Sequence, residues 1–440
     1  MTYSIQYLII FLSWLAPAAS FWSTKTQSRR PTFLRQSWQS HVSTHPESSS
    51  ALTKLLDEIT GNKDEIDLVF LFVGQAHASD FEAIVKQASK SLGPNTRLLS
   101  LIGAGVIGER QEVDEPQRPS MSILTGTLPK GAEMEIFSYD RETTSLDCDY
   151  ASYLLFADPW SSVDSLMEEL SQTNSIVAGG ISCPPRVQPS LAIDGQVLPQ
   201  GSVAGVSFSG TLGLQAVVAQ GCRPLGPAFL VTACDQNVIT ELNYKPALQV
   251  FEDMVKTANE EEREQMGTGL VCGIAASTED EEEDYLIRQI TGLVTNVSGI
   301  AIGGQVNLGD RFSFHVRDKS TAEQDLQLMV QRAKTHRLFD ETKAKPVAAV
   351  QISCVGRGRG LFDVPNVDLS NIQNLLDGPV AGFFANGEIG PVGIAGFSTT
   401  NSKTYMHSFT TVAALLCDYS GSNDEESASA PSEDPVDAWG

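Results

Sequence analysis

Paired cysteines and clustered histidines are missing from this 440-residue sequence. The cysteines number seven, an odd count, and no two of them form a C-x-x-C pair. This scatter disfavours a disulfide framework and a zinc knuckle, and it fits a reducing compartment better. The six histidines show no H-E-x-x-H or similar spacing. We therefore predict no metal site and no cofactor.

Basic residues are also scarce, with 30 Lys and Arg against 54 Asp and Glu and a formal net charge of −24. Nucleic-acid binding needs clustered Lys and Arg against phosphate, so this class of partner is excluded. Much of the acidity lies in two runs, 279–284 and 424–437. Such runs are typical of a solvated loop and a disordered acidic tail.

No apolar run is long enough to span a bilayer comfortably. The longest near the start, Tyr7–Ala19, precedes small residues at 18–20 and is typical of a signal peptide over residues 1–20. The following 21–46 stretch is basic, rich in Ser and Thr, and free of Asp and Glu. Together with Phe21, this order resembles the bipartite presequences of algal plastids with extra membranes. We expect 21–50 to be transit-peptide-like and the protein to reach a plastid; secretion is the alternative.

The chain from about residue 50 has the pattern of an α/β protein. The apolar run Asp67–Val73 predicts a buried strand, and Asp80 precedes a helix with an apolar stripe ending near Gly93. Another strand, Arg97–Ile102, follows directly, so we expect a crossover unit. We also expect paired strands within Met121–Ser138, and we expect the two prolines of Gly221–Pro227 to break a sheet. The length predicts two or three domains with mixed β-sheets flanked by helices.

A literal G-x-G-x-x-G occurs at Gly103–Gly108, directly after a predicted strand. A dinucleotide site also needs a helix opening at the glycines and an acidic residue about twenty positions on. The continuation Glu109–Pro119 carries two prolines and no apolar stripe, and 124–129 contains no acid. We interpret the motif as a structural turn.

Two glycine-rich segments, Ser353–Phe362 and Gly382–Gly393, combine backbone that can approach a small molecule with polar side chains. Arg357 and Arg359 lie in the first segment, and Asn386 and Glu388 lie in the second. They form either a pocket wall or plain tight turns between buried strands. In the second interpretation an arginine forms an internal salt bridge with Glu388.

Several segments together resemble the FIST family, a sensory domain pair found in bacterial signalling proteins and some F-box proteins. The resemblance covers about residues 65–415, in the order of the family. It implies a FIST N-terminal domain over 51–245, a FIST C-terminal domain over 246–417 and an acidic tail over 418–440. The segments are Gly103–Gly108 with Leu128-Pro129, Gly221–Pro227, Tyr244–Leu248, Tyr285–Arg288, Phe314–Asp318, Ser353–Gly358 and Gly382–Pro391.

The resemblance implies a small-ligand sensor, with amino acids or similar metabolites as proposed ligands and no established chemistry. No F-box, kinase or cyclase segment is evident, so signalling would need an unknown protein partner or ligand buffering. We expect non-enzymatic binding of an amino acid or small carboxylate, because guanidinium groups grip carboxylates. The candidate ligand-binding residues are Arg223, Arg288, Arg317, Arg357, Arg359, Asn386 and Glu388.

Two alternatives come from other functional classes. In the first, Cys354 is the nucleophile of a hydrolase or acyl transferase, with Arg357 and Arg359 lowering its pKa and His315 or His407 as the base. A cysteine at the end of a strand is more often a small buried hydrophobe. In the second, the chain is an adaptor whose acidic surface recruits a basic protein.

Overall fold

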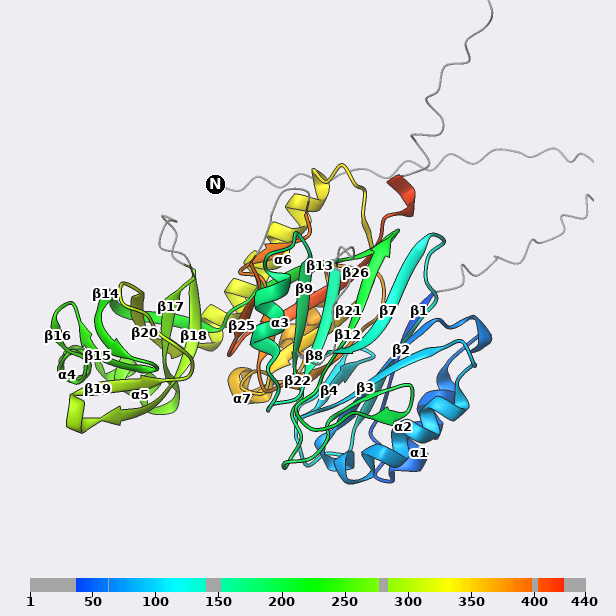
Figure 1. Ribbon diagram of the computed structural model, residues 1–440, viewed down its shortest axis with the longest axis horizontal. Helices are drawn as coiled ribbons and strands as arrows, with labels where there is room; N and C mark the ends of the chain where they lie inside the picture. Colours follow the sequence, from blue (N-terminus) through cyan, green and yellow to red (C-terminus); the bar gives the residue numbers. More distant parts are fainter. Residues whose placement is uncertain (1–36, 62, 140–151, 277–283, 398–402, 423–440) are drawn as a thin grey trace, which may run out of the picture. The chain divides into compact units, whose positions relative to one another are not determined.

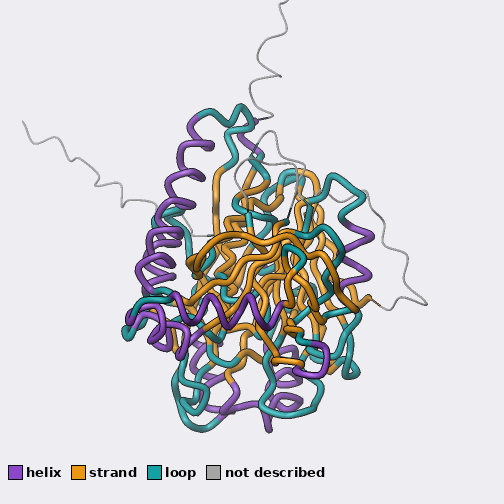
Figure 2. The backbone as a smooth tube through the Cα atoms, turned by 90° about the vertical axis from the view of Figure 1, so that its left-hand side faces the viewer, coloured by secondary structure: helices purple, strands orange, loops and turns teal. Residues whose placement is uncertain are grey.

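The hydrophobic strand segments assemble into four sheets, with helices lying around the outside of the strands (Figures 1 and 2). The computed structural model describes residues 37–61, 63–139, 152–276, 284–397 and 403–422. The predicted α/β class with mixed sheets is confirmed. The predicted signal peptide, the first part of the transit-like segment and most of the acidic tail lie outside the described residues.

The first sheet contains the predicted crossover unit. Strands β2 and β3 pair in parallel and are joined through helix α2 (Phe81–Ser91), as expected. Helices α1 (Ser48–Glu58) and α2 cover one face of this sheet (Figure 1), where their apolar stripes are buried. The strand order is β1 (Trp38–Ser43), β6 (Met121–Gly126), β2 (Leu68–Gly74), β3 (Arg97–Gly103), β10 (Leu191–Ile193) and β11 (Gln196–Val197).

The second sheet joins strands from distant parts of the sequence. Its strand β23 pairs with β9 on one side and with β25 on the other, so residues near 388 meet residues near 180. The strand order is β25 (Tyr405–His407), β23 (Glu388–Gly390), β9 (Ile176–Ile181), β8 (Ser152–Ala157), β12 (Val203–Gly210) and β7 (Ala132–Tyr139).

The third sheet also joins strands from distant parts of the sequence. Strand β26, the last strand of the chain, lies between β13 and β21, and β22 pairs with the short strand β4. The strand order is β24 (Ile394–Ala395), β13 (Leu212–Ala219), β26 (Thr411–Asp418), β21 (Lys345–Cys354), β22 (Val380–Ala385), β4 (Val106–Gly108) and β5 (Gln111–Val113).

One hydrophobic core connects these three sheets. Phe72 of the first sheet stacks on Phe383 of the third, with ring centroids 5.7 Å apart. Phe156 of the second sheet meets Phe383 edge-on at 5.9 Å. All three rings are fully buried, so the three sheets share one packed interior.

The fourth sheet is built from one continuous stretch, residues 222–317. Strand β14 pairs with β20 through its first half and with β15 through its second half, which closes the strands into a ring. We call this unit the ring. Its strand order is β14 (Cys222–Asp235), β20 (Arg311–Arg317), β17 (Leu270–Ala275), β18 (Tyr285–Val294), β19 (Gly299–Ile302), β15 (Val238–Leu242) and β16 (Lys245–Pro246).

The remaining helices follow the apolar spacing and capping residues of the sequence. Helix α6 begins where the Asp318 carboxylate accepts a hydrogen bond from the Thr321 backbone N–H at 2.7 Å, as a predicted N-cap does. It contacts strand β13 of the third sheet. The other helices are α3 (Val163–Leu170), α4 (Ala247–Thr257), α5 (Glu260–Gly269), α6 (Lys319–Leu338), α7 (Arg359–Phe362) and α8 (Val367–Gln373), with 3₁₀ turns at Lys63–Glu65, Gln75–Asp80, Thr295–Val297 and Ser420–Ser422.

Two strand predictions were wrong. Strands β6 and β7 do not pair with each other, because β6 lies between β1 and β2 while β7 pairs with β12. The Gly221–Pro227 run does not break its sheet; β14 continues through it, with a register shift between Leu225 and Phe229 opposite β20. Pro224 lies where β14 has β20 as its partner and not yet β15, so a proline is tolerated there.

The glycine motif at 103–108 is a turn between strands, as predicted. Strand β3 ends at Gly103 and strand β4 begins at Val106, within the motif, so no helix opens there. Gly105 is needed for close approach, because a Cβ atom there would lie 2.0 Å from the backbone oxygen of Val113.

The second half of the transit-like segment 21–50 belongs to the folded unit. Strand β1 pairs with β6 along its whole length, and Trp38 is buried against Gly126, where a side chain would clash with the indole. Among the residues that the structure describes, no helix combines the length and apolar character that crossing a membrane requires.

Candidate functional site

The two glycine-rich segments meet a third segment at one end of the third sheet. The Cys354 backbone N–H donates to the Thr410 carbonyl at 3.0 Å, and Val355 donates to Ala385 at 2.9 Å. The third segment, Met406–Thr410, leads into β26, and we call it the junction turn. Phe409 within it has φ of 63°, a left-handed conformation that costs energy for an aromatic residue.

Arg357 is engaged by protein groups. Its Nε and Nη2 atoms donate to the two carboxylate oxygens of Asp368 at 2.7 and 2.8 Å. Its Nη1 donates to the carbonyls of Gln220 and Phe409 at 3.3 and 3.4 Å. The side chain is 1% exposed and lies over the Phe362 ring. Arg357 therefore fixes the segments around it.

A buried polar chain extends from this ion pair. Ser353 Oγ lies 2.8 Å from Thr411 Oγ1 and accepts a hydrogen bond from Gln351 at 3.0 Å. Gln351 in turn donates to Glu112 at 3.3 Å. Burial, followed by the charge of Asp368, raises the pKa of Glu112 to about 7. This carboxyl group also accepts backbone N–H bonds from Asn366 and Leu369, so it ties β5 to α8.

Glu388 is buried beside the Cys354 thiol. Its Oε2 accepts hydrogen bonds from the Thr410 backbone N–H at 3.2 Å and hydroxyl at 2.7 Å, and the carboxyl group also lies in hydrogen-bond contact with the Cys354 side chain. Burial raises the pKa of Glu388 to about 8, against the lowering effect of Thr410. Burial, followed by the Glu388 charge, raises the pKa of the Cys354 thiol well above its usual range.

Two buried histidines adjoin these groups. His407 is paired in register with Glu388, and its Nε2 lies 3.1 and 3.0 Å from the carbonyl oxygens of Gly390 and Pro391. Its Nδ1 has no hydrogen-bond partner within the described ranges, whereas the His315 ring lies in hydrogen-bond contact with the Cys222 backbone. Burial lowers the pKa of each histidine to about 4.

Two arginines of the ring contact the junction turn. Arg317 of β20 donates from Nη2 to the Gly356 carbonyl and lies 5.4 Å from the centroid of the Phe409 ring. Arg288 of β18 donates from Nη1 to the Met406 carbonyl at 3.0 Å and to the Ile287 carbonyl at 2.9 Å. Both side chains are half-buried.

The other predicted site residues lie elsewhere or are exposed. Arg359 is 45% exposed and pairs with Asp114 and Glu115. Asn386 is exposed, with its backbone N–H bound to the Ile181 carbonyl. Arg223 donates to the Gln265 side chain at 2.6 Å. Among the predicted residues, the structure thus brings Cys354, Glu388, Arg288, Arg317 and Arg357 to the junction turn.

Some residues of this cluster could not be chosen from the sequence. Asp368 is the partner of Arg357, and Thr410 binds Glu388, yet neither lies in a glycine-rich segment. Phe409 carries no local signal beyond its position before a buried strand. The predicted salt bridge of an arginine with Glu388 is not formed, because Asp368 holds the Arg357 fork.

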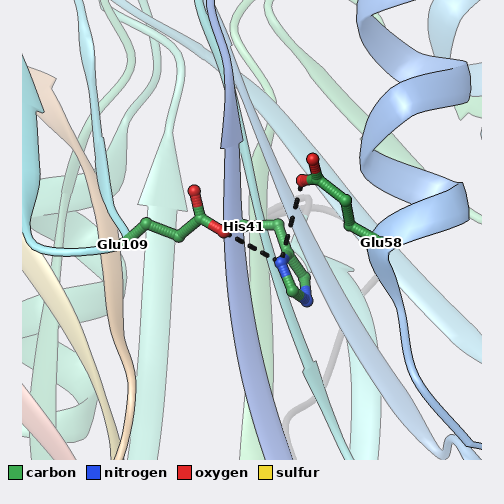
Figure 3. Close-up of side chains that lie close together, drawn as sticks. All are labelled: His41, Glu58 and Glu109. Carbon is green, nitrogen blue, oxygen red and sulfur yellow. Dashed lines mark hydrogen bonds and ion pairs between the residues drawn. The ribbon is translucent and has the colours of Figure 1, made fainter.

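A separate cluster at the surface contains side chains of the kinds that bind metal ions. His41 Nδ1 lies 3.0 Å from Glu109 Oε1 and 3.8 Å from Glu58 Oε2, and the three donor atoms lie within 4.8 Å of one another (Figure 3). An imidazole with two carboxylates suits Zn²⁺. Lys54 also lies 3.8 Å from Glu58, and a hydrogen bond between His41 and Glu109 accounts for their contact.

Comparison with known proteins adds two kinds of similarity. The family model of the FIST N domain matches residues 67–245, and that of the FIST C domain matches residues 247–391. An uncharacterized protein of Mycobacterium tuberculosis is 31% identical over 403 residues, which cover 86% of this chain and 98% of the relative. An uncharacterized protein of Mycobacterium bovis is 30% identical over 382 residues, covering 82% and 93%.

Proposed function

The chain belongs to the FIST family, generally a family of sensory signal-transduction domains, and we propose that it binds a small metabolite without catalysis. The proposed ligands are amino acids or small carboxylates. The proposed site is the junction turn with the residues around it, Arg288, Arg317, His315, His407 and Glu388.

The observation that carries this proposal is a group of buried polar side chains at and beside the junction turn that their neighbours satisfy only in part. His407 Nδ1 is buried there without a partner among the described residues, and the buried Glu388 carboxyl has only Thr410 and the Cys354 thiol as partners. A buried polar atom without a partner costs about 1–3 kcal/mol, so such groups are rare unless they have a function. A polar ligand that enters between the ring and the junction turn would supply the missing partners.

The environment of Cys354 favours binding over covalent catalysis. The thiol is 6% exposed, and its raised pKa leaves little thiolate at neutral pH. His407 directs Nε2 toward two backbone carbonyls, so that nitrogen is occupied. A hydrolase or acyl transferase using Cys354 is the alternative, and it requires a reactive thiolate that this environment opposes.

A ligand screen tests the proposal. Residues 37–422 are mixed with single amino acids and small carboxylates, and thermal unfolding is measured. A ligand that binds the folded state alone raises the unfolding temperature, and the rise grows with the logarithm of the ligand concentration once this exceeds the Kd. Arg317→Ala should abolish the rise, whereas Arg118→Ala, an exposed arginine paired with Glu115, should not. Equal rises in both variants would place the ligand elsewhere.

Output and delivery are further parts of the proposal. We propose that signalling, if it occurs, passes through a protein partner or through ligand buffering, because FIST regions cover most of the chain. We also propose that the N-terminal segment directs the protein to a plastid. A fluorescent fusion of residues 1–50 should accumulate in that organelle, and accumulation in the secretory pathway would overturn the localisation.

A further inference from the structure

We propose that the junction site takes a small dicarboxylate, with Arg288 and Arg317 each donating to one carboxylate group. This inference rests on the proposed function and narrows its ligand class from amino acids and carboxylates to dianions. It depends on the charges, the contacts and the spacing of the two arginines.

Neither guanidinium forms an ion pair with a carboxylate in the described part of the chain. Arg288 donates to the carbonyls of Ile287 and Met406, and Arg317 donates to the carbonyl of Gly356. The charge of Asp164 acts on Arg288 from beyond ion-pair distance, with less effect on its pKa than burial. Arg357, by contrast, is paired with Asp368 at two points. In a protein of net charge −24, two cations without an ion pair suit an anion.

Both arginines retain donors suited to carboxylates. Arg288 donates to these carbonyls through Nη1, which leaves Nε and Nη2 on the edge that binds a carboxylate at two points. Gly304 lies beside this edge with φ of 117°, and a Cβ there would lie 3.2 Å from Arg288 Nε. Arg317 uses Nη2 for Gly356 and keeps Nε and Nη1. Both side chains are half-buried, so these donors are sheltered and still reachable.

The spacing of the two arginines suits a ligand with two acidic ends. Arg288 contacts the junction turn at Met406, and Arg317 contacts it at Phe409, three residues later. Three residues of chain span at most about 10 Å, so both guanidiniums lie along one short segment. His315 lies on the same face of β20 as Arg317, two residues away.

Among the described residues of this cluster, neither Asp368 nor Glu388 offers a free carboxylate to the ammonium of an amino acid. Asp368 is engaged at both oxygens by Arg357. Glu388 already accepts two hydrogen bonds from Thr410, and its raised pKa keeps it protonated at neutral pH. A zwitterion would therefore leave its positive end without a carboxylate partner, whereas a dianion matches both arginines.

Isothermal titration of residues 37–422 tests the inference with succinate and glutarate against acetate, glycine, alanine and inorganic phosphate at constant ionic strength. A dicarboxylate should bind at least roughly tenfold more tightly than acetate, since a charge-assisted hydrogen bond contributes about 1.5–3 kcal/mol. Arg288→Gln and Arg317→Gln should each remove most of this preference, and Arg118→Gln should not change it. Thermal unfolding without ligand checks that each variant folds.

If Arg317→Gln fails to fold, Arg317→Lys replaces it, because this variant keeps the positive charge and loses the guanidinium group. Its affinity for the dicarboxylate should lie between that of the wild type and that of acetate binding. Tighter binding of glycine or alanine than of any dicarboxylate would overturn the dianion inference while supporting the proposed function. Phosphate binding as tight as succinate would overturn the dicarboxylate assignment. If no compound in this set or in the amino-acid screen binds, both proposals fail.

Discussion

Arg357 and Asp368 form a two-point ion pair inside the protein, with N–O distances of 2.7 and 2.8 Å and side chains that are 0% and 1% exposed. The pair links the loop after β21 to helix α8, and the third nitrogen of Arg357 reaches the junction turn at Phe409. The pair therefore holds the loop after β21, helix α8 and the junction turn together beside the candidate site.

Removing one partner of this pair should destabilise the protein strongly. Arg357→Ala leaves the Asp368 charge buried without a partner, which costs about 3–5 kcal/mol. Denaturant unfolding of the variant should show a correspondingly lower midpoint. Arg359→Ala, the matched change at an exposed arginine, should cost less than about 1 kcal/mol. Equal midpoints for Arg357→Ala and the wild type would contradict this role.

Glu388 should make stability depend on pH in a definite direction. Its pKa is about 8 in the folded chain, against an ordinary value of 4.5. Between these values the unfolded state loses the proton and the folded state keeps it, so the contribution of Glu388 to stability falls as pH rises through this window. Glu388→Gln should therefore flatten the fall between pH 5 and 8, measured by urea unfolding. The exposed Glu323→Gln should leave the slope unchanged; an unchanged slope in Glu388→Gln as well would refute the prediction.

His407 should make the protein less stable as the pH is lowered, which is the opposite of the effect of Glu388. Its pKa is lowered to about 4 in the folded chain, from an ordinary 6.5. As pH falls through this window, His407 is protonated in the unfolded state but stays neutral in the folded state. The free energy of unfolding therefore decreases. His407→Gln should lose less stability than the wild type between pH 6.5 and 4.5. His45→Gln, at an exposed histidine, is the control, and parallel losses in all three proteins would speak against a buried neutral His407.

Cys354 should react slowly with thiol reagents in the folded protein. Burial and the Glu388 carboxyl disfavour its thiolate, whereas Cys183 and Cys234 are only half-buried. Peptide mapping after brief alkylation at pH 7 should find label at Cys183 or Cys234 before Cys354. In denaturant, the three cysteines should be labelled at similar rates. Early labelling of Cys354 in the folded chain would instead favour the nucleophile alternative.

Elements governed by local pattern could be predicted from the sequence. Helix α2 and the parallel pair β2 and β3 follow from apolar periodicity, and Asp318 caps α6 because an acceptor side chain precedes the helix. Strand partners depend on distant segments instead, so the hairpin expected between β6 and β7 was wrong: each strand found other partners.

The candidate site was predictable to the same extent. Glycine-rich turns located the segments of Cys354 and Glu388, and a guanidinium at Arg357 indicated a charge partner nearby. The sequence could not identify Asp368 as that partner, because the pair forms only when α8 packs against β21. The domain boundary at residue 246 stays a prediction.

The position of β26 has a consequence for when the protein can fold. This strand, Thr411–Asp418, is the last of the described strands, yet it lies in the middle of the third sheet between β13 and β21. During synthesis, the two flanking strands leave the ribosome without the strand that joins them. The shared core therefore cannot close until about residue 418 has emerged.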